Sequence, residues 1–258
     1  MHEVRTLVLA VAILVVPSVA TAEPGALRVM SYNLNYANPD FAGTMDAIAA
    51  ADVDVILLQE VGKAWEDALA KRFAKRYPHQ VFRLHDRTPG GLAVLSKLRI
   101  TSEELVPAPP KSWFPAQLVV VDSSFGKVQV LNVHLRPAID RGSWIRGYQT
   151  TPAIRLAQIE AFWPRLAPKL PTVIVGDFNE EPSGSAVEFL GKKGLARVPT
   201  QGPTTWHYAR TVGKRAISLL SMDIDHVMID SGLTAVDAHV VDAGASDHRP
   251  VIVTLNKK

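Results

Sequence analysis

The sequence predicts an α/β fold in which β-sheets are covered by helices. Short apolar runs rich in β-branched residues alternate with stretches of helical periodicity, and several runs follow one another without an intervening helix. Long apolar strands of this kind need helices to cover them. The chain has 258 residues, 47% hydrophobic and 21% charged, so it can bury the core of one large domain.

Strands are expected where a short apolar run is bounded by turn-forming or polar residues. The clearest run, 172–175, is β-branched and lies between Pro171 and Gly176. In chain order, we expect strands at residues 28–32, 55–58, 80–84, 92–95, 118–121, 128–133, 172–175, 224–229, 235–241 and 251–255.

Helices are expected in the stretches between these strands. From Trp65 onward, Leu69 and Phe73 fall on one side and a group of basic residues falls on the other, which indicates a helix with a solvated face. In chain order, we expect helices near residues 44–51, 65–76, 154–166 and 185–190.

The first 22 residues have the pattern of a secretory signal peptide. Arg5 gives a positive start, residues 7–16 form an unbroken apolar run, and Ala20-Thr21-Ala22 supplies small residues for cleavage. The apolar run is too short to span a bilayer, and no later segment is long and apolar enough to do so. We therefore expect an exported protein, periplasmic or secreted, with one domain over residues 23–258 and no integral membrane segment after cleavage.

Composition excludes some chemistry and narrows the choice of partners. The chain has no cysteine, which excludes disulfides, thiol catalysis and cysteine-based zinc sites. Its formal net charge of +3 does not change when the first 22 residues are removed, because they contain one arginine and one glutamate. This mild positive charge favours anionic partners without identifying nucleic acid.

The most informative motif is Gly176-Asp177-Phe178-Asn179, which follows directly on the run 172–175. Strand side chains repeat with a period of two, so Asp177 and Asn179 emerge on the same side. A carboxylate can polarise a group or accept a proton, and an amide can donate to a phosphoryl oxygen without adding charge. The pair suits a metal-bound phosphate, although a turn after a strand also favours Asp and Asn.

Polar side chains of the same kinds stand at the ends or starts of other apolar strands. Burying such groups unpaired is unfavourable, so their repeated placement predicts one shared rim. These residues are Asn33, Gln59, Glu60, Asn132, His134, Asp223, Asp225, His226, Asp247 and His248.

The chain carries an ordered set of motifs, which is Ser31-Tyr32-Asn33-Leu34, Leu58-Gln59-Glu60, Gly91-Leu92-Ala93-Val94-Leu95-Ser96, Asn132-Val133-His134, Gly176-Asp177-Phe178-Asn179, Ile224-Asp225-His226-Val227 and Ser246-Asp247-His248-Arg249-Pro250. In this order they resemble the endonuclease/exonuclease/phosphatase superfamily, which includes DNase I, exonuclease III, abasic-site endonucleases, neutral sphingomyelinases and inositol polyphosphate phosphatases. The resemblance runs from about Leu27 to Leu255. It implies a four-layer αββα sandwich, with two mixed sheets flanked by helices and the site at one end of the facing sheets.

The resemblance assigns the metal site to oxygen-bearing residues. Glu60 matches the principal Mg²⁺ ligand of the family, and Asn33 lies where the family has an amide beside that metal. Asp247 is either a second acid beside the metal or a residue that positions His248. Mg²⁺ prefers hard oxygen ligands and keeps several waters, so one or two carboxylates suffice. We therefore expect Mg²⁺, or Mn²⁺ in its place, as the cofactor.

The resemblance also assigns the catalytic groups. His248 and Asp225 match a His-Asp pair in which the carboxylate fixes the imidazole tautomer and the imidazole activates water. Asp177 and Asn179 would face the scissile phosphate from the other side, where Asp177 orients water or assists the leaving group.

His134 resembles the histidine that contacts the phosphate in DNase I-like members. There it pairs with a glutamate, which has no counterpart in residues 89–96 of this chain. A general-acid pair of that type is therefore in doubt, and His134 can instead donate to the phosphate. Asp223 is expected to be either a structural acid or one that supports the catalytic residues from behind, and His226 is expected to be structural.

Substrate contacts are expected from three loops with basic and aromatic side chains. The loop 136–152 is long enough to be functional, and the loop 201–215 leads toward Asp225. The third loop, 107–115, is rich in proline and carries two adjacent aromatic residues that could touch lipid. Each aromatic residue could instead anchor its loop to the core. The predicted substrate contacts are Arg136, Arg141, Arg146 and Trp206.

The favoured function is an exported, Mg²⁺-dependent phosphodiesterase that cleaves DNA or RNA through attack of a His-activated water on a metal-bound phosphate. The alternative is a phospholipid phosphodiesterase of the sphingomyelinase type, with peripheral lipid contact, or a phosphatase. A non-catalytic protein that binds anionic ligands is a remote alternative, because the catalytic residue set is intact. We expect a monomer.

Overall fold

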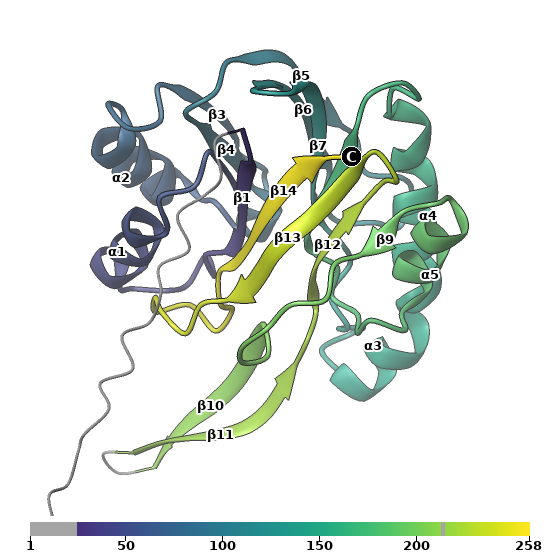
Figure 1. Cartoon of the computed structure of the whole chain (residues 1–258). Coiled ribbons are helices and arrows are strands. Elements are labelled where there is room, and N and C mark those ends of the chain that lie inside the picture. The colour runs from purple at the N-terminus through teal and green to yellow at the C-terminus, as the bar shows by residue number, and fades with distance from the viewer. Residues whose placement is uncertain (1–24, 213–214) are drawn as a thin grey trace, which may run out of the picture.

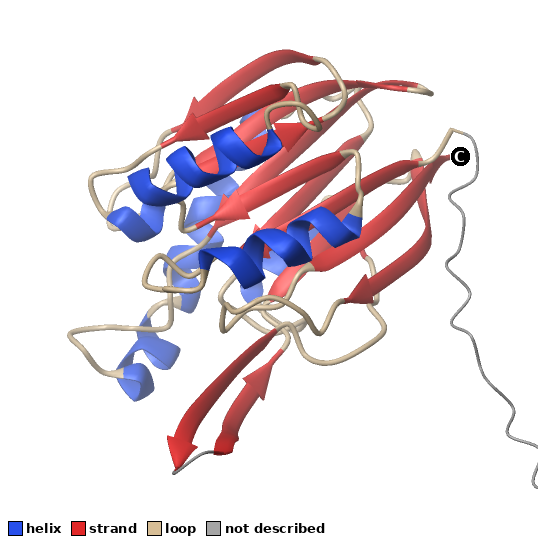
Figure 2. Ribbon diagram, turned by 90° about the vertical axis from the view of Figure 1, so that its left-hand side faces the viewer, coloured by secondary structure: helices blue, strands red, loops and turns tan. Residues whose placement is uncertain are grey.

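Two β-sheets pack face to face in this protein, and helices cover the outer side of each sheet (Figure 1, Figure 2). The computed structural model describes residues 25–212 and 215–258. The expected four-layer αββα sandwich is confirmed. The predicted signal peptide, residues 1–22, lies outside the described residues and stays a prediction.

The first sheet has its six strands in the order β13-β14-β1-β2-β4-β3. β1 and β2 are parallel because a helix crosses over between them, and the other neighbours are antiparallel. The strands are β1 (Leu27–Asn33), β2 (Val55–Gln59), β3 (His79–Arg83), β4 (Leu92–Ser96), β13 (Leu233–Val240) and β14 (Val251–Lys257).

The second sheet has the order β5-β6-β7-β8-β12-β9, and β7 and β8 are its parallel pair. Its strands are β5 (Ile100–Val106), β6 (Ala116–Ser123), β7 (Gly126–His134), β8 (Thr172–Asp177), β9 (Ala196–Arg197) and β12 (Asp225–Ile229). β5 and β9 are not among the strands expected from the sequence. Both are edge strands that bury little, so neither carries a continuous apolar run.

The helices lie on the outer faces of the two sheets (Figure 1). They are α1 (Phe41–Ala51), α2 (Lys63–Phe73), α3 (Trp144–Thr150), α4 (Pro152–Phe162) and α5 (Ser185–Lys192), with short 3₁₀ turns η1 (Thr88–Gly90) and η2 (Trp163–Arg165). The four expected helices are α1, α2, α4 and α5. The expected loop 136–152 was wrong in part, because it contains α3, which begins after the N-cap Ser143.

Alternating side chains divide the core into three apolar layers. Along β1, Val29 packs between the sheets, and Met30 packs against α1 and α2. Along β7, Val130 packs between the sheets, and Leu131 packs against α4 and α5. Both faces of each central strand are therefore buried, which explains why these strands are almost continuously apolar.

A two-stranded hairpin, β10 (Trp206–Val212) and β11 (Arg215–Met222), projects away from the body of the sandwich (Figure 2). The sequence analysis expected a loop over residues 201–215, and this was wrong in part, because β10 begins at Trp206. The hairpin does not lie against either sheet, so it lacks the apolar alternation that predicts a strand. Tyr208, Leu219 and Leu220 are exposed on it.

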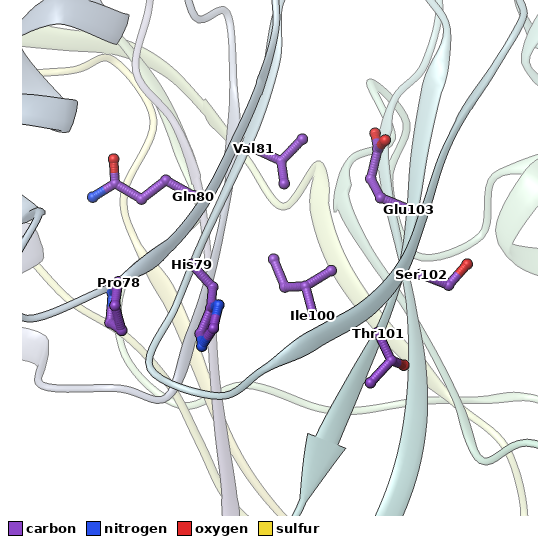
Figure 3. A pocket seen from close by; sticks show the side chains of 8 residues that line it. All are labelled: Pro78, His79, Gln80, Val81, Ile100, Thr101, Ser102 and Glu103. Carbon is purple, nitrogen blue, oxygen red and sulfur yellow. The ribbon is translucent and has the colours of Figure 1, made fainter.

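The facing edges of the two sheets leave a shallow cavity of about 450 Å³ between β3 and β5 (Figure 3). Val81 and Ile100 contribute apolar walls, and Glu103, which pairs with Arg83, contributes charge. None of the predicted catalytic residues lines this cavity.

Within residues 25–212 and 215–258, none of the helices is long and apolar enough to cross a membrane.

Candidate active site

The polar strand ends converge at one end of the sandwich, at the bottom of Figure 1. His134 at the end of β7 pairs in register with Asp177 at the end of β8, and Asp177 pairs with Asp225 at the start of β12. Asn33 ends β1 in the other sheet and bonds to Asp177 across the gap. The shared rim expected from the sequence is therefore present.

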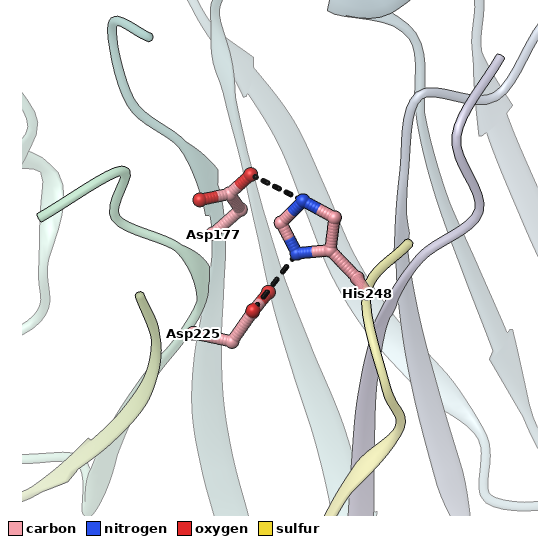
Figure 4. A group of neighbouring side chains, drawn as sticks. All are labelled: Asp177, Asp225 and His248. Atoms are coloured by element: carbon pink, nitrogen blue, oxygen red, sulfur yellow. Dashed lines mark hydrogen bonds and ion pairs between the residues drawn. The ribbon is translucent and has the colours of Figure 1, made fainter. Parts of the chain in front are cut away.

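A line of three buried side chains forms the centre of this rim (Figure 4). His248 Nδ1 lies 2.9 Å from Asp225 Oδ2, and His248 Nε2 lies 3.6 Å from Asp177 Oδ2. Burial alone lowers the pKa of His248, but the Asp225 and Asp177 carboxylates outweigh it and raise the pKa to about 10. The imidazole therefore bridges two acids, with its tautomer fixed by Asp225.

Two hydroxyl groups hold this line in position. Thr205 Oγ1 accepts the backbone N–H of Asp225 at 3.0 Å. Ser246 Oγ accepts the backbone N–H of His248 at 3.1 Å and donates to the carbonyl of Asn33 at 2.8 Å. Each hydroxyl is buried, so it ties a catalytic segment to the sheets where water cannot compete.

Glu60 and Asn33 form the opposite wall of the site. The Asn33 amide nitrogen donates to Glu60 Oε1 at 3.2 Å and to Asp177 Oδ2 at 3.0 Å, so it links the two carboxylates. The other Glu60 oxygen accepts the N–H of Tyr36 at 3.0 Å. Glu60 adopts a left-handed backbone with φ 61°, which is strained for a residue with a side chain and is common at functional sites. Burial raises its pKa.

Asp177 is positioned by the residues on either side of it. A Cβ on Gly176, where φ is 143°, would lie 2.0 Å from the Val133 carbonyl oxygen, so β8 approaches β7 too closely for any other residue. On the other side, the Asn179 N–H donates to Asp177 Oδ1 at 2.8 Å. Burial raises the pKa of Asp177 to about 6. One N–H of the Asn179 side-chain amide donates to the Leu135 carbonyl oxygen. The second N–H of this amide is left for a ligand.

His134 faces the same carboxylates from the end of β7. Its Nδ1 lies 2.9 Å from the carbonyl oxygen of Pro89. A carbonyl oxygen can only accept a hydrogen bond, so Nδ1 is the donor and carries the proton. Its Nε2 lies 3.6 Å from Asp177 Oδ2 and 3.9 Å from Glu60 Oε1. Burial lowers the pKa of His134, and the Phe114 ring stacks on it. A backbone carbonyl therefore fills the position that a glutamate would have in a DNase I-type pair.

Asp247 points toward the hairpin. Its Oδ2 accepts the indole N–H of Trp206 at 3.0 Å, and its Oδ1 accepts from the Asn35 amide at 2.9 Å. These bonds tie Asp247 to the hairpin and to Asn35, which suits the positioning role, and the metal-binding role stays open because Oδ2 keeps a free lone pair. Trp206 is largely buried, and its ring lies 6.4 Å from the exposed Trp144 of α3.

The three arginines predicted to contact substrate lie in different surroundings. Arg141 and Arg146 are exposed around α3, and Arg146 pairs with Asp140 at 3.0 Å. Arg136 is buried against the ring of Trp113. Within the described part of the chain, no hydrogen bond or ion pair joins any of the three to the catalytic line.

The sequence analysis placed Gln59 and Asn132 at the rim but assigned them no role. Gln59 Nε2 donates to Asn132 Oδ1 at 2.7 Å, and this fully buried pair joins the two sheets beneath the rim. The role of Thr205 was also missed, because a single threonine in a turn carries no local signal of what it bonds. His226, expected to be structural, points away from the site and bonds the carbonyl of Glu180 at 2.8 Å.

Comparison with known proteins decides the family. The sequence profile of the Endonuclease/Exonuclease/phosphatase family matches residues 30–248, which is most of the chain and includes every site residue described in this section. The chain belongs to the endonuclease/exonuclease/phosphatase family. No curated protein matches the chain.

Several solved structures superpose on 90% of the chain. The endonuclease/exonuclease/phosphatase from Beutenbergia cavernae is 25% identical, with a TM-score of 0.65, and the match covers 90% of this chain and 72% of that one. Sphingomyelinase C from Streptomyces griseocarneus is 21% identical, with a TM-score of 0.67 over 90% of this chain and 99% of that one. A humanized TDP2 from D. rerio is 20% identical, with a TM-score of 0.68 and the same coverage.

Members of the endonuclease/exonuclease/phosphatase family hydrolyse phosphoester bonds with the help of divalent metals. The donor atoms of this site have the corresponding chemistry. Asp177, Asp225 and His248 each offer a ligand atom within 4.8 Å of the others, and Glu60 adds a partly buried carboxylate opposite them. This concentration of buried negative charge fits a hard divalent cation.

Proposed function

We propose that the protein is a divalent-metal-dependent phosphodiesterase that cleaves DNA or RNA. The observation that carries the proposal is the line Asp225–His248–Asp177, which faces the Glu60 and Asn33 wall across the rim. A base with a fixed tautomer, opposite a carboxylate suited to a metal, is the arrangement that attack of water on a phosphodiester requires.

Glu60 is the residue best suited to hold the metal, with Asn33 beside it. The Glu60 carboxylate is held by Tyr36 and Asn33, so it is oriented before a cation arrives. Bound Mg²⁺ or Mn²⁺ would polarise the phosphoryl oxygens and offset their charge. Asp247 bonds Trp206 and Asn35, so we assign it the positioning of the segment that carries His248.

Without a bound cation, Asp225 and Asp177 keep the His248 imidazole protonated. A bound divalent cation would offset that negative charge, and His248 would then be neutral and take a proton from the attacking water at Nε2. Asp225 accepts the Nδ1–H and stabilises the imidazolium that forms. Asn179 would donate its free amide hydrogen to a phosphoryl oxygen, and Asp177 would orient the water or assist the leaving group. His134, neutral and donating to the Pro89 carbonyl, presents Nε2 to the same space.

Nucleic acid is the leading substrate because the protein is mildly basic and carries two exposed arginines, Arg141 and Arg146, on the segment that follows His134. The test is a panel of single- and double-stranded DNA, RNA, sphingomyelin vesicles and 4-nitrophenyl phosphate, each with Mg²⁺ or Mn²⁺. We expect metal-dependent cleavage of DNA or RNA that is absent from His248→Ala, which excludes a contaminating nuclease. Absence of turnover on every phosphodiester would contradict the proposal.

A phospholipid phosphodiesterase is the second candidate, and one observation favours it. Large apolar side chains are exposed on α3 and on the hairpin, which are linked through Trp144 and Trp206. Clustered apolar side chains beside a site are suited to a lipid surface. The exposed residues are Trp144, Ile145, Tyr148, Tyr208, Leu219 and Leu220. Cleavage of sphingomyelin in vesicles, with no cleavage of DNA or RNA, would decide for this candidate.

Lipid contact through the loop 107–115 is not supported in the form expected. Phe114 is 2% exposed and stacks on His134, so it cannot enter a membrane without leaving the site.

Export to the periplasm or medium, and a monomeric state, remain proposals that rest on the sequence. Mass spectrometry of the mature N-terminus, expected near Glu23, and light scattering would test them.

A further inference from the structure

Arg136 is a buried cation beside the active site that forms no ion pair with a described residue, although the Asp140 carboxylate attracts it from farther away. It is 6% exposed, and no carboxylate of the described residues lies within ion-pair distance of its guanidinium group. Its Nε and Nη1 atoms are shielded from solvent and make no hydrogen bond. Burying an unpaired charge is unfavourable, and native proteins rarely leave such donors unsatisfied. The fold by itself therefore does not explain this residue.

Trp113 and Arg87 surround the guanidinium group of Arg136. Arg136 Cζ lies 3.0 Å from the centroid of the Trp113 ring, and Arg87 Cζ lies 5.5 Å from the same centroid. Two guanidinium groups thus share one indole ring, which attracts both. Arg87 is exposed. Burial is the main cause that lowers the pKa of Arg136 to about 10. The Asp140 carboxylate acts in the opposite direction and the charge of Arg87 adds to the lowering, so Arg136 remains charged at neutral pH.

This pair of arginines is rigidly connected to the active site. The Phe114 ring stacks on His134 with centroids 4.5 Å apart, and Trp113 packs edge-on against Phe114 at 6.0 Å. Arg136 follows His134 by two residues, so their Cα atoms are at most about 7 Å apart. The Arg136 backbone N–H donates to Gln158 Oε1 at 2.7 Å, which fixes the chain at this point.

We propose that Arg136 and Arg87, stacked with Trp113, form a subsite for a second phosphate group, adjacent to the scissile phosphate along a nucleic acid strand. The proposal rests on the proposed phosphodiesterase activity. A phosphate would neutralise two cations that otherwise repel each other, and guanidinium donors match its oxygens in geometry and charge. Arg87 is exposed, so it can close over the ligand. The Arg136 donors Nε and Nη1 are shielded under Trp113 in the free protein, so a phosphate would reach them only if the Trp113 side chain moves. A phospholipid with a single phosphate would leave this subsite unused.

The experiment compares three thymidine dinucleotides, each with one phosphodiester bond. One has no other phosphate, one carries an added 5′-phosphate and one an added 3′-phosphate. We expect the full-length wild-type protein with Mg²⁺ to cleave one of the two phosphorylated dinucleotides with a kcat/KM about 10- to 100-fold above that of the unmodified one, as for a charge-assisted hydrogen bond. Arg136→Gln should bring this ratio close to one, and Arg87→Gln should lower it. Arg165→Gln is the matched control, because this exposed arginine pairs with Glu104, and it should keep the wild-type ratio.

The outcomes separate the subsite from the activity on which it rests. Equal cleavage of all three dinucleotides by the wild type, or an unchanged ratio in folded Arg136→Gln, overturns the subsite and leaves the phosphodiesterase activity standing. Failure of the wild type to cleave any of them overturns both. If Arg136→Gln does not fold by circular dichroism, Arg87→Gln decides, because its exposed side chain can be replaced without disturbing the core.

Discussion

Replacing His248 by alanine, alone and together with Asp225→Asn, tests the central line of the site. His248 Nδ1 and Asp225 Oδ2 are 2.9 Å apart, and both side chains are more than nine-tenths buried. General-base catalysis contributes about 10²- to 10⁴-fold, equivalent to about 3–5 kcal/mol of transition-state stabilisation. We expect His248→Ala to lower kcat by that factor with little change in KM, because the proton moves only as the transition state forms.

Asp225→Asn keeps the shape of the pair but removes its charge. The imidazolium that forms during the reaction then loses its anionic partner, so kcat should fall within the same range. One of the carboxylates that raise the pKa of His248 would also be gone, so the acidic limb of the kcat profile should move to lower pH. Base and partner act as a unit, and the double variant should therefore be little worse than the poorer single variant.

The assay is steady-state hydrolysis of bis(4-nitrophenyl) phosphate with Mg²⁺, with circular dichroism to confirm folding. A matched control exists on the surface, where His239 Nδ1 lies 2.9 Å from Asp237 Oδ2 with both side chains substantially exposed. His239→Ala should leave turnover unchanged. The reasoning is refuted if folded His248→Ala keeps near-normal turnover, or if the losses from Asp225→Asn and His248→Ala simply multiply.

Three further changes test other parts of the site. Exhaustive EDTA treatment should abolish hydrolysis and added Mg²⁺ or Mn²⁺ should restore it; full activity without any bound metal would exclude the proposed cofactor. Replacing Arg141 and Arg146 together by alanine should weaken nucleic acid binding and flatten its dependence on salt, whereas an unchanged salt slope and affinity would assign these residues to structure. Burial raises the pKa of Asp177 from 3.8 to about 6, so the stability contributed by its protonated form is present below about pH 4 and is lost as pH rises to about 6. In metal-free buffer, Asp177→Asn should therefore gain stability over the wild type across this window by an amount on the order of 1–3 kcal/mol. The free energy of unfolding of both proteins would be measured by urea denaturation at each pH, and a difference between them that does not change with pH would contradict this.

Patterns that act over a few residues were enough to predict most of the fold. The run 172–175 could only be a buried strand, and the side-chain period of two put Asp177 and Asn179 on one side of its end. The edge strand β5 and the hairpin β10–β11 were not predicted. They bury little apolar surface, so no local pattern marks them.

The sequence by itself determined which residue types stand at the rim, because strand ends and turn residues are fixed by local backbone preferences and short-range periodicity. Only the tertiary structure decided which side chain meets which. His134 donates to the Pro89 carbonyl, Asp247 accepts from Trp206, and Arg136 stacks on Trp113. Each of these contacts joins segments that are separated in the chain, and their geometry is set by how the strands and loops are arranged in space rather than by any property of the neighbouring residues.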